Sequence, residues 1–171
     1  PLRRFAKSEI VPSNKDRFLR KETLQGFVHD EASAFFGGLA GNAGLFSTAR
    51  DVARVYQMLL NGGEIDGQRY LSKETCQLFT TETSKISRRG LGFDKPDADD
   101  PKKGNCAPAA PAGVYGHTGF TGTCAWVDPV NELVYVFLSN RIYPDVTNRK
   151  LNQLHIRERI QGAIYDAMKK K

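Results

Sequence analysis

The segment 115–123 contains residue types that can bind a carboxylate or a developing oxyanion. His117 and Thr118 are followed by Gly119, at a point where an extended run begins. Imidazole and hydroxyl groups form hydrogen bonds, and glycines leave backbone N–H groups accessible along a strand edge. Preorganised donors of this kind stabilise the charge that develops in acyl transfer, and each contributes about 3 kcal/mol.

This spacing leads to a set of candidate roles. We expect Thr118 to hydrogen-bond a substrate carboxylate, His117 to give electrostatic help according to its neighbours, and the backbone N–H of Phe120 to donate to an oxyanion. The candidate substrate-binding residues are His117, Thr118, Gly119 and Thr121.

Gly116 and Gly119 lack side chains that would hold a substrate away, so a peptide-like substrate could pair with this edge as an added strand. The same spacing has a second, purely structural interpretation. A glycine-rich hairpin whose histidine only satisfies a nearby carbonyl fits it equally well.

Composition excludes several other classes. The chain has 171 residues, 40% apolar and 26% charged, as expected for a soluble globular domain. The longest apolar run, 133–138, is too short to span a bilayer. The net charge of +6 comes largely from the chain ends, which argues against nucleic-acid binding. Cys76, Cys106 and Cys124 share no Cys-x-x-Cys spacing, so we expect neither a disulfide framework nor a zinc site.

Local signals divide the chain into four segments of one domain. We expect an irregular lead-in at 1–30, a glycine-rich loop with helices at 31–93, an exposed loop at 94–113, and a β-meander with a terminal helix at 114–171. Thr48 and Asp51 cap a core helix that ends at Asn61, and Ser72 begins a shorter helix to about Phe79. The first helix has one apolar face: Val52, Val55, Tyr56, Leu59 and Leu60.

The C-terminal third predicts strands at about 114–118, 123–128 and 132–139, antiparallel to one another. The last strand is apolar on both faces, so we expect cover on both sides. A helix over about 147–168 follows, with Arg157, Glu158 and Arg159 facing outward. Its expected buried row is Leu151, Leu154, Ile160, Ile164 and Met168.

No metal or cofactor site is expected. The glycine run 37–44 lacks the Lys-Ser/Thr of a phosphate loop. The acidic run 97–100 lacks the glycine and closing Glu of a calcium loop, and Pro101 interrupts it. The adjacent residues His29, Asp30 and Glu31 are unsuited to converge on one ion, which favours a hydrogen-bonded loop.

The string 116–123, Gly-His-Thr-Gly-Phe-Thr-Gly-Thr, resembles the third signature of the serine β-lactamase and penicillin-binding family. There, a Lys or His precedes Thr-Gly on a substrate-lining strand. The stretches 37–51, 59–63, 88–93 and 127–140 resemble the same family in collinear order. The resemblance implies an α+β fold, of which this chain would be the C-terminal half: antiparallel strands of the central sheet, the long C-terminal helix and part of the helical region.

The resemblance also implies a function. The family includes β-lactamases, D-alanyl-D-alanine carboxypeptidases and esterases. Its members form an acyl-enzyme on a Ser, which is activated by a Lys three residues further along the chain. No Ser-x-x-Lys occurs here, and Tyr70 follows the core helix, too late for the family's Tyr motif. Ser139 and Cys124 have no neighbouring base motif, and we expect His155 on the terminal helix to be a surface residue. Asn42 replaces a His that relatives often carry.

We therefore expect the nucleophile and general base in a missing N-terminal half, and an inactive isolated chain. A β-lactam, a D-alanyl peptide or an ester would be the substrate. The expected setting is bacterial and exported, with a possible fused glycoside hydrolase domain. The alternative is a non-catalytic domain of the same fold that binds cell-wall peptide or a protein partner.

Overall fold

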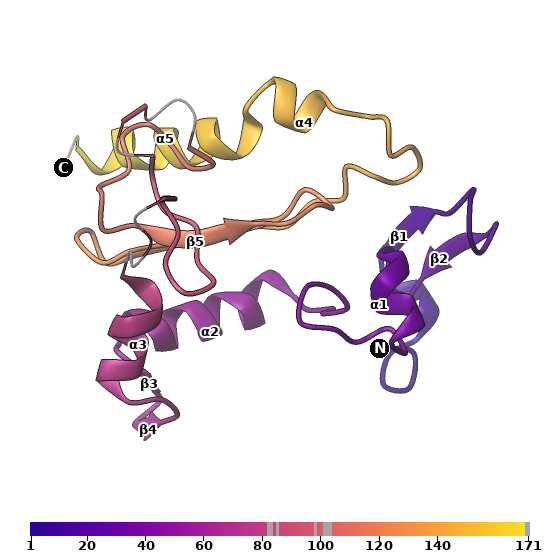
Figure 1. The fold of residues 1–171 in the computed structure, drawn as a ribbon, viewed down its shortest axis with the longest axis horizontal. Coiled ribbons are helices and arrows are strands. Elements are labelled where there is room, and N and C mark those ends of the chain that lie inside the picture. The colour runs from indigo at the N-terminus through magenta and orange to yellow at the C-terminus, as the bar shows by residue number, and fades with distance from the viewer. Residues whose placement is uncertain (82–83, 85, 98, 101–103, 170–171) are drawn as a thin grey trace.

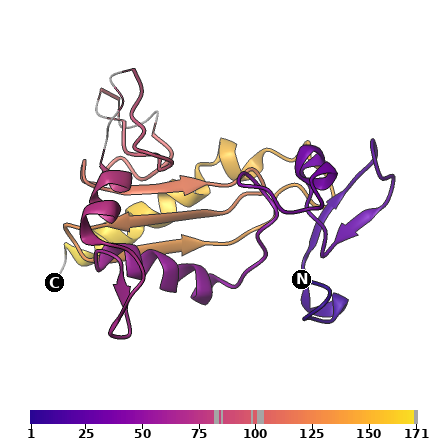
Figure 2. The same ribbon diagram turned by 60° about the horizontal axis from the view of Figure 1, so that its bottom comes forward.

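The protein is α+β, with a central three-stranded antiparallel sheet between helices (Figure 1, Figure 2). This computed structural model describes residues 1–81, 84, 86–97, 99–100 and 104–169; Pro101 and the terminal Lys170 and Lys171 lie outside them. The strands are β5 (Tyr115–Thr118), β6 (Cys124–Asp128) and β7 (Leu133–Phe137), in the order β5-β6-β7. All three predicted strands are confirmed as antiparallel neighbours.

The sheet has a helix against each face, as Figure 1 shows. Because side chains alternate along a strand, Cys124 and Trp126 share one face with Tyr135, which pairs with Trp126. These side chains are buried, and Ile164 of helix α5 (Ile156–Met168) packs on them. Helix α2 (Ala49–Leu60) covers the opposite face, where it contacts β6 and β7. The expected two-sided cover of β7 is therefore confirmed.

The capped helices form where the sequence predicts them. Thr48 Oγ1 accepts the Asp51 N–H at the start of α2 (3.2 Å), and Ser72 Oγ accepts the Thr75 N–H at the start of α3 (Lys73–Thr80; 3.1 Å). A hairpin of β3 (Glu64–Ile65) and β4 (Gln68–Arg69), which was not predicted, joins them. The predicted core helix α2 packs on the sheet, but its apolar face is only partly covered in this chain: no residue of α2 is fully buried, and Val55 is 53% exposed.

The lead-in 1–30 is more ordered than its composition predicts. It contains the 3₁₀ helix η1 (Lys7–Glu9) and the antiparallel strands β1 (Pro12–Lys15) and β2 (Thr23–Gln25), and α1 (Glu31–Phe35) follows. The Asp16 carboxylate organises the connection between the strands, because it accepts N–H groups from Phe18, Leu19 and Arg20. The Arg20 side chain and these N–H groups hold the pKa of Asp16 well below its usual value, although burial opposes this.

The terminal helix differs from its prediction in continuity and in orientation. It is divided into α4 (Lys150–Gln153) and α5, because His155 between them has a left-handed backbone (φ 48°). The buried stripe of α5 is Arg157, Gln161 and Tyr165, spaced four residues apart on one face. Leu154, in the expected apolar row, is instead 53% exposed.

Directed hydrogen bonds explain this polar stripe. Gln161 Oε1 accepts the Ala107 N–H (2.8 Å), and the Tyr165 hydroxyl donates to Asp128 Oδ2 on β6 (2.8 Å). Arg157 Nη1 donates to the Thr123 carbonyl (3.2 Å), and the Tyr135 hydroxyl on β7 donates to the backbone carbonyl of Arg157 (3.1 Å). Burial, aided by the Asp128 carboxylate, raises the pKa of Tyr165, so this hydroxyl stays a donor.

The loop 94–113 is not simply exposed. Asp94 and Lys95 at its start are buried, as are Cys106 and Ala107, which pack under α5. The expectation of an exposed loop is therefore wrong at these two places, because long-range contacts that composition does not reveal bury them.

Replacing Tyr165 by Phe tests the anchor of α5. The change leaves the ring but removes the donor to a buried carboxylate, so we expect the free energy of unfolding to fall by about 1–3 kcal/mol in equilibrium urea unfolding. Tyr70→Phe is the matched control, because the Tyr70 side chain is 60% exposed and its hydroxyl bonds an exposed Gln68. Equal losses in the two variants would contradict the assigned role of the Tyr165 hydroxyl.

Candidate active site

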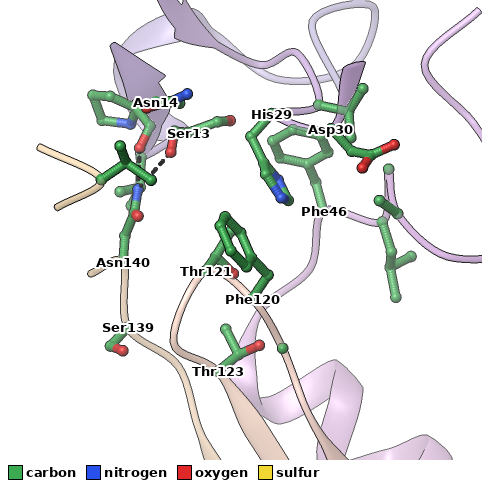
Figure 3. Close-up of a pocket in the computed structure, with 18 of the residues that line it drawn as sticks. Ser13, Asn14, His29, Asp30, Phe46, Phe120, Thr121, Thr123, Ser139 and Asn140 are labelled. Carbon is green, nitrogen blue, oxygen red and sulfur yellow. Dashed lines mark hydrogen bonds between the residues drawn. The ribbon is translucent and has the colours of Figure 1, made fainter. Parts of the chain in front are cut away.

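A cleft of about 1400 Å³ lies beside the end of β5. The turn after β5 forms one wall, while β1, segment 28–32, segment 42–47 and segment 138–140 line the rest. Figure 3 shows Phe120, Thr121 and Thr123 on that wall, with His29 and Asn140 nearby. Every residue proposed from sequence for catalysis or substrate binding lines this cleft: His117, Thr118, Gly119, Phe120 and Thr121.

Backbone pairing determines which part of β5 is open to a ligand. At Gly116 the outer edge is occupied, because Asp94 N donates to Gly116 O (2.7 Å) and Gly116 N donates to Asp94 O (3.1 Å). Thr118 has the same orientation two residues further on, so its N–H and C=O also point outward. The Phe120 N–H has no acceptor within the part of the chain that the structure describes. The open edge therefore runs from Thr118 to Phe120.

The two glycines of this strand and turn serve internal packing. A Cβ on Gly116 would lie 2.1 Å from the Ala125 carbonyl oxygen, and one on Gly119 would lie 2.3 Å from Thr123 Oγ1. The Gly119 N–H also donates to the Thr123 carbonyl (2.8 Å) and closes the turn. We expected these glycines to make room for a substrate. The structure gives another reason for them: they allow β5 and its turn to pack closely.

His117 is hydrogen-bonded through both ring nitrogens. Arg89 Nη1 lies 2.7 Å from His117 Nε2, and His117 Nδ1 lies 2.6 Å from the Thr118 carbonyl oxygen. A guanidinium has no acceptor, so Nε2 must accept from Arg89. A carbonyl oxygen only accepts, so Nδ1 must carry the proton. This arrangement requires the neutral imidazole, with the positive charge on Arg89.

An ion pair between the partly exposed Arg88 and the buried Asp94 carboxylate fixes the segment that carries Arg89. Arg88 Nε lies 2.7 Å from Asp94 Oδ1, and Asn105 Nδ2 donates to Asp94 Oδ2 (2.8 Å). Burial alone would raise the pKa of Asp94, but the hydrogen bonds from Arg88 and Asn105 hold it below its usual value. Arg88, which precedes Arg89, is thus bound to Asp94, whose backbone pairs with Gly116.

The ring of Phe120 is held in place by groups from distant parts of the chain. The His29 ring stacks on it, with 5.4 Å between ring centroids and 9° between ring planes (Figure 3). The Arg141 guanidinium lies over the same ring at 4.6 Å from its centroid. Burial lowers the pKa of His29, which favours its neutral form. These contacts restrain the residue whose N–H is open to the cleft.

The segment after β7 ties the turn to the N-terminal strands. Ser139 Oγ donates to the Gly122 carbonyl (2.9 Å), and the Arg141 N–H donates to the Thr121 carbonyl (2.8 Å). Asn140 Nδ2 donates to the carbonyls of Pro12 and Ser13 on β1, the latter at 3.1 Å (Figure 3). Sequence reasoning missed these residues as part of the site; the one available signal was that 127–140 resembles the family.

The other chemical groups considered from sequence do not complete a catalytic site. The Cys124 thiol is buried, which raises its pKa to about 11 and keeps it protonated near neutrality. The Ser139 hydroxyl bonds a carbonyl, Tyr70 does not line the cleft, and His155 is exposed. Asp30 caps α1 through the Ser33 N–H, and no group of three potential metal ligands occurs among the described residues.

Comparisons with known proteins show the family to which this chain belongs. A family model described as Beta-lactamase matches residues 7–158, which is most of the chain. The chain therefore belongs to the serine β-lactamase-like family, which includes penicillin-binding enzymes.

Individual relatives agree with the family match. A protein of Escherichia coli K12 named "putative D-alanyl-D-alanine carboxypeptidase" is 37% identical over 135 residues, which is 78% of this chain and 31% of that protein. Proteins of the same name from Salmonella agona and Salmonella typhi are each 38% identical over 141 residues, with the same shares. The chain thus spans about a third of the length of these relatives.

Replacing Arg88 by Gln tests the ion pair behind the site. It leaves Asp94 buried without its charged partner, so we expect a loss of about 3 kcal/mol in the free energy of unfolding at pH 7. The pKa of Asp94 in the folded protein should rise, because burial then dominates. The stabilisation by an Asp with a lowered pKa is lost as the pH falls through that pKa. The variant should therefore lose stability at higher pH than the unmodified protein.

The measurement is urea unfolding at several pH values from about 3 to 7, a range that spans the usual Asp pKa. Arg69→Gln is the control, because Arg69 and its partner Glu64 are both exposed and such pairs contribute about 1 kcal/mol or less. Identical acid profiles for Arg88→Gln and the unmodified protein would contradict the role of the ion pair.

Proposed function

We propose that this chain forms one wall of the active site of a serine hydrolase that works through an acyl-enzyme on an amide or ester. The observation that carries the proposal is the open edge Thr118–Phe120, which lines the cleft and whose Phe120 N–H has no acceptor among the described residues. A preorganised N–H in a cleft is what a tetrahedral intermediate requires. The β-lactamase family match supports this chemistry.

Each residue of the wall then has a role. Phe120 N–H donates to the oxyanion, and the Thr118 hydroxyl binds a substrate carboxylate. His117 orients the edge through its bond to the Thr118 carbonyl. Gly119 allows the tight turn, and Thr121 holds that turn through its carbonyl bond to Arg141. A β-lactam, a D-alanyl peptide and a simple ester all present a carbonyl that suits this arrangement.

The nucleophilic Ser and the general base are proposed to lie in the rest of the protein. No Ser-x-x-Lys occurs in the 171 residues, and the chain spans 31% of a relative's length. Large apolar side chains are exposed near the cleft: Phe35 and Phe36 are each 78% exposed, and Leu45, which lines the cleft, is 87% exposed. We propose that the remaining part of the domain packs against them, since burial of such side chains is favourable.

We propose that the protein is exported by a bacterium, to the periplasm or beyond. A fused glycoside hydrolase domain is a further part of this proposal. The names of the relatives, which refer to carboxypeptidases, support this placement. Among the described residues, no helix is both long and apolar enough to cross a membrane.

The first test is covalent labelling. Full-length protein incubated with a labelled β-lactam or an activated ester should gain the mass of one acyl group. The 171-residue chain alone should not, because it lacks the attacking group. Labelling of the chain alone would show that it contains a nucleophile, contrary to the proposal. Saturable binding of a cell-wall peptide without any adduct would instead support a non-catalytic binding domain.

Replacing Thr118 by Val tests the wall itself. The change keeps the side-chain shape and removes the hydroxyl, so acylation of full-length protein by a carboxylate-bearing β-lactam should slow by roughly 10–100-fold, as for loss of a hydrogen bond to a charged group. Thr23→Val on β2 is the control and should leave the rate unchanged, because Thr23 does not line the cleft. Unchanged rates in both variants, with intact folding, would remove Thr118 from the site.

A further inference from the structure

Arg89 contacts the proposed site through one short hydrogen bond. Its Nη1 lies 2.7 Å from His117 Nε2, although the two residues are 28 positions apart in the chain. The neighbours of Arg89 in sequence are fixed on both sides. Arg88 is paired with buried Asp94, and the Gly90 N–H donates to the Phe93 carbonyl (3.0 Å). A Cβ at Gly90 would lie 2.7 Å from the Thr81 carbonyl, so this turn packs closely against the end of α3.

We infer that Arg89 is a positioning residue that holds His117 as the neutral Nδ1–H tautomer and places a fixed positive charge directly behind this wall of the cleft. The inference rests on the proposed function for its enzymatic consequence, but the tautomer follows from hydrogen bonding alone. Arg89 can only donate to Nε2, which leaves the proton on Nδ1. A guanidinium stays charged throughout the physiological range, whereas an imidazole does not.

The tautomer determines what the open edge offers to a ligand. His117 Nδ1–H occupies the Thr118 carbonyl at 2.6 Å, and this carbonyl is the outward-facing acceptor of that residue. The cleft-lining groups left to a ligand are donors, the Phe120 N–H and the Thr118 hydroxyl, while Arg89 itself does not line the cleft. A wall made of donors, with a fixed cation behind it, favours a ligand that has an anionic group next to its reactive carbonyl.

Other charged and titratable groups around His117 do not replace Arg89. On β6 the residue opposite His117 is Ala125. From α2, Tyr56 lines the cleft, and burial raises its pKa, so it is uncharged near neutrality. Across the cleft, His29 and Arg141 both lie against the Phe120 ring, and Asp30 caps α1. Within the described residues, Arg89 is the one charged group hydrogen-bonded to the His117 ring.

The direct test is the nitrogen spectrum of His117 in full-length protein labelled with ¹⁵N-histidine. The signals are assigned as those lost in His117→Gln. At pH 7 we expect one pyrrole-type nitrogen, Nδ1, and one pyridine-type nitrogen, Nε2. In Arg89→Met, which removes the donor, we expect the two neutral tautomers to mix, so that the pyrrole-type and pyridine-type signals move towards each other. Arg89→Lys keeps a cationic donor and should restore much of the original spectrum.

The functional test compares two probes, a labelled penicillin with its free carboxylate and its neutral methyl ester. With Arg89→Met, acylation by the carboxylate form should slow by about tenfold at pH 8, as for loss of a charged hydrogen-bonding partner. The methyl ester should show little change. Arg159→Gln on the outward face of α5 removes an equal charge and should alter neither probe.

Failures of the two ideas are distinguishable. Absence of labelling in every variant would count against the proposed function, while the nitrogen spectrum would still decide the role of Arg89. An imidazolium at pH 7, an Nε2–H tautomer, or an Arg89→Met spectrum identical to that of the unmodified protein would overturn the inference. So would equal slowing of the penicillin and its ester, since that would indicate a purely structural role for Arg89.

Discussion

The backbone pairing of Asp94 with Gly116 is the constraint on which the rest of the site depends. It occupies β5 up to Gly116 and leaves the next outward-facing groups, from Thr118 to Phe120, open to the cleft. On the other side of the strand, residue 116 must lack a side chain, because a Cβ there would lie 2.1 Å from the Ala125 carbonyl oxygen on β6. The Asp94 carboxylate extends the effect, since it binds Arg88 and thereby places Arg89 beside His117. One short contact thus sets both the geometry and the charge of this wall.

The opposite side of the site depends on contacts between segments that are far apart in sequence. Asn140 connects the end of the sheet to β1, and His29 from the loop before α1 stacks on Phe120. The N-terminal strands therefore support the same turn that β5 and β6 form. Together these contacts make the open N–H of Phe120 part of a fixed arrangement, which is the condition under which an oxyanion donor is effective.

The sequence predicted the parts of the fold that depend on local signals. Strands β5 to β7 and the capped helices α2 and α3 follow from alternation, turn residues and caps, and the cleft-lining residues 117–121 were found because they are contiguous. Periodicity failed for α5, where the Arg157 and Gln161 side chains are buried against distant hydrogen-bond partners, the Thr123 carbonyl and the Ala107 N–H. Arg89, His29 and Asn140 were missed for the same reason, because nothing local in a sequence indicates a contact across 28 or more positions.

The polar underside of α5 has a consequence for how uniquely this protein folds. Apolar surfaces in contact tolerate small rotations and translations at little cost, whereas Gln161 and Tyr165 meet single partners in single directions. A leucine at position 161 would bury more apolar area. It would also leave the Ala107 N–H without its acceptor and remove a directional contact that fixes the position of the helix. The polar stripe thus contributes less apolar burial than a leucine-rich one would, but it fixes a single position and rotation of α5 on the sheet.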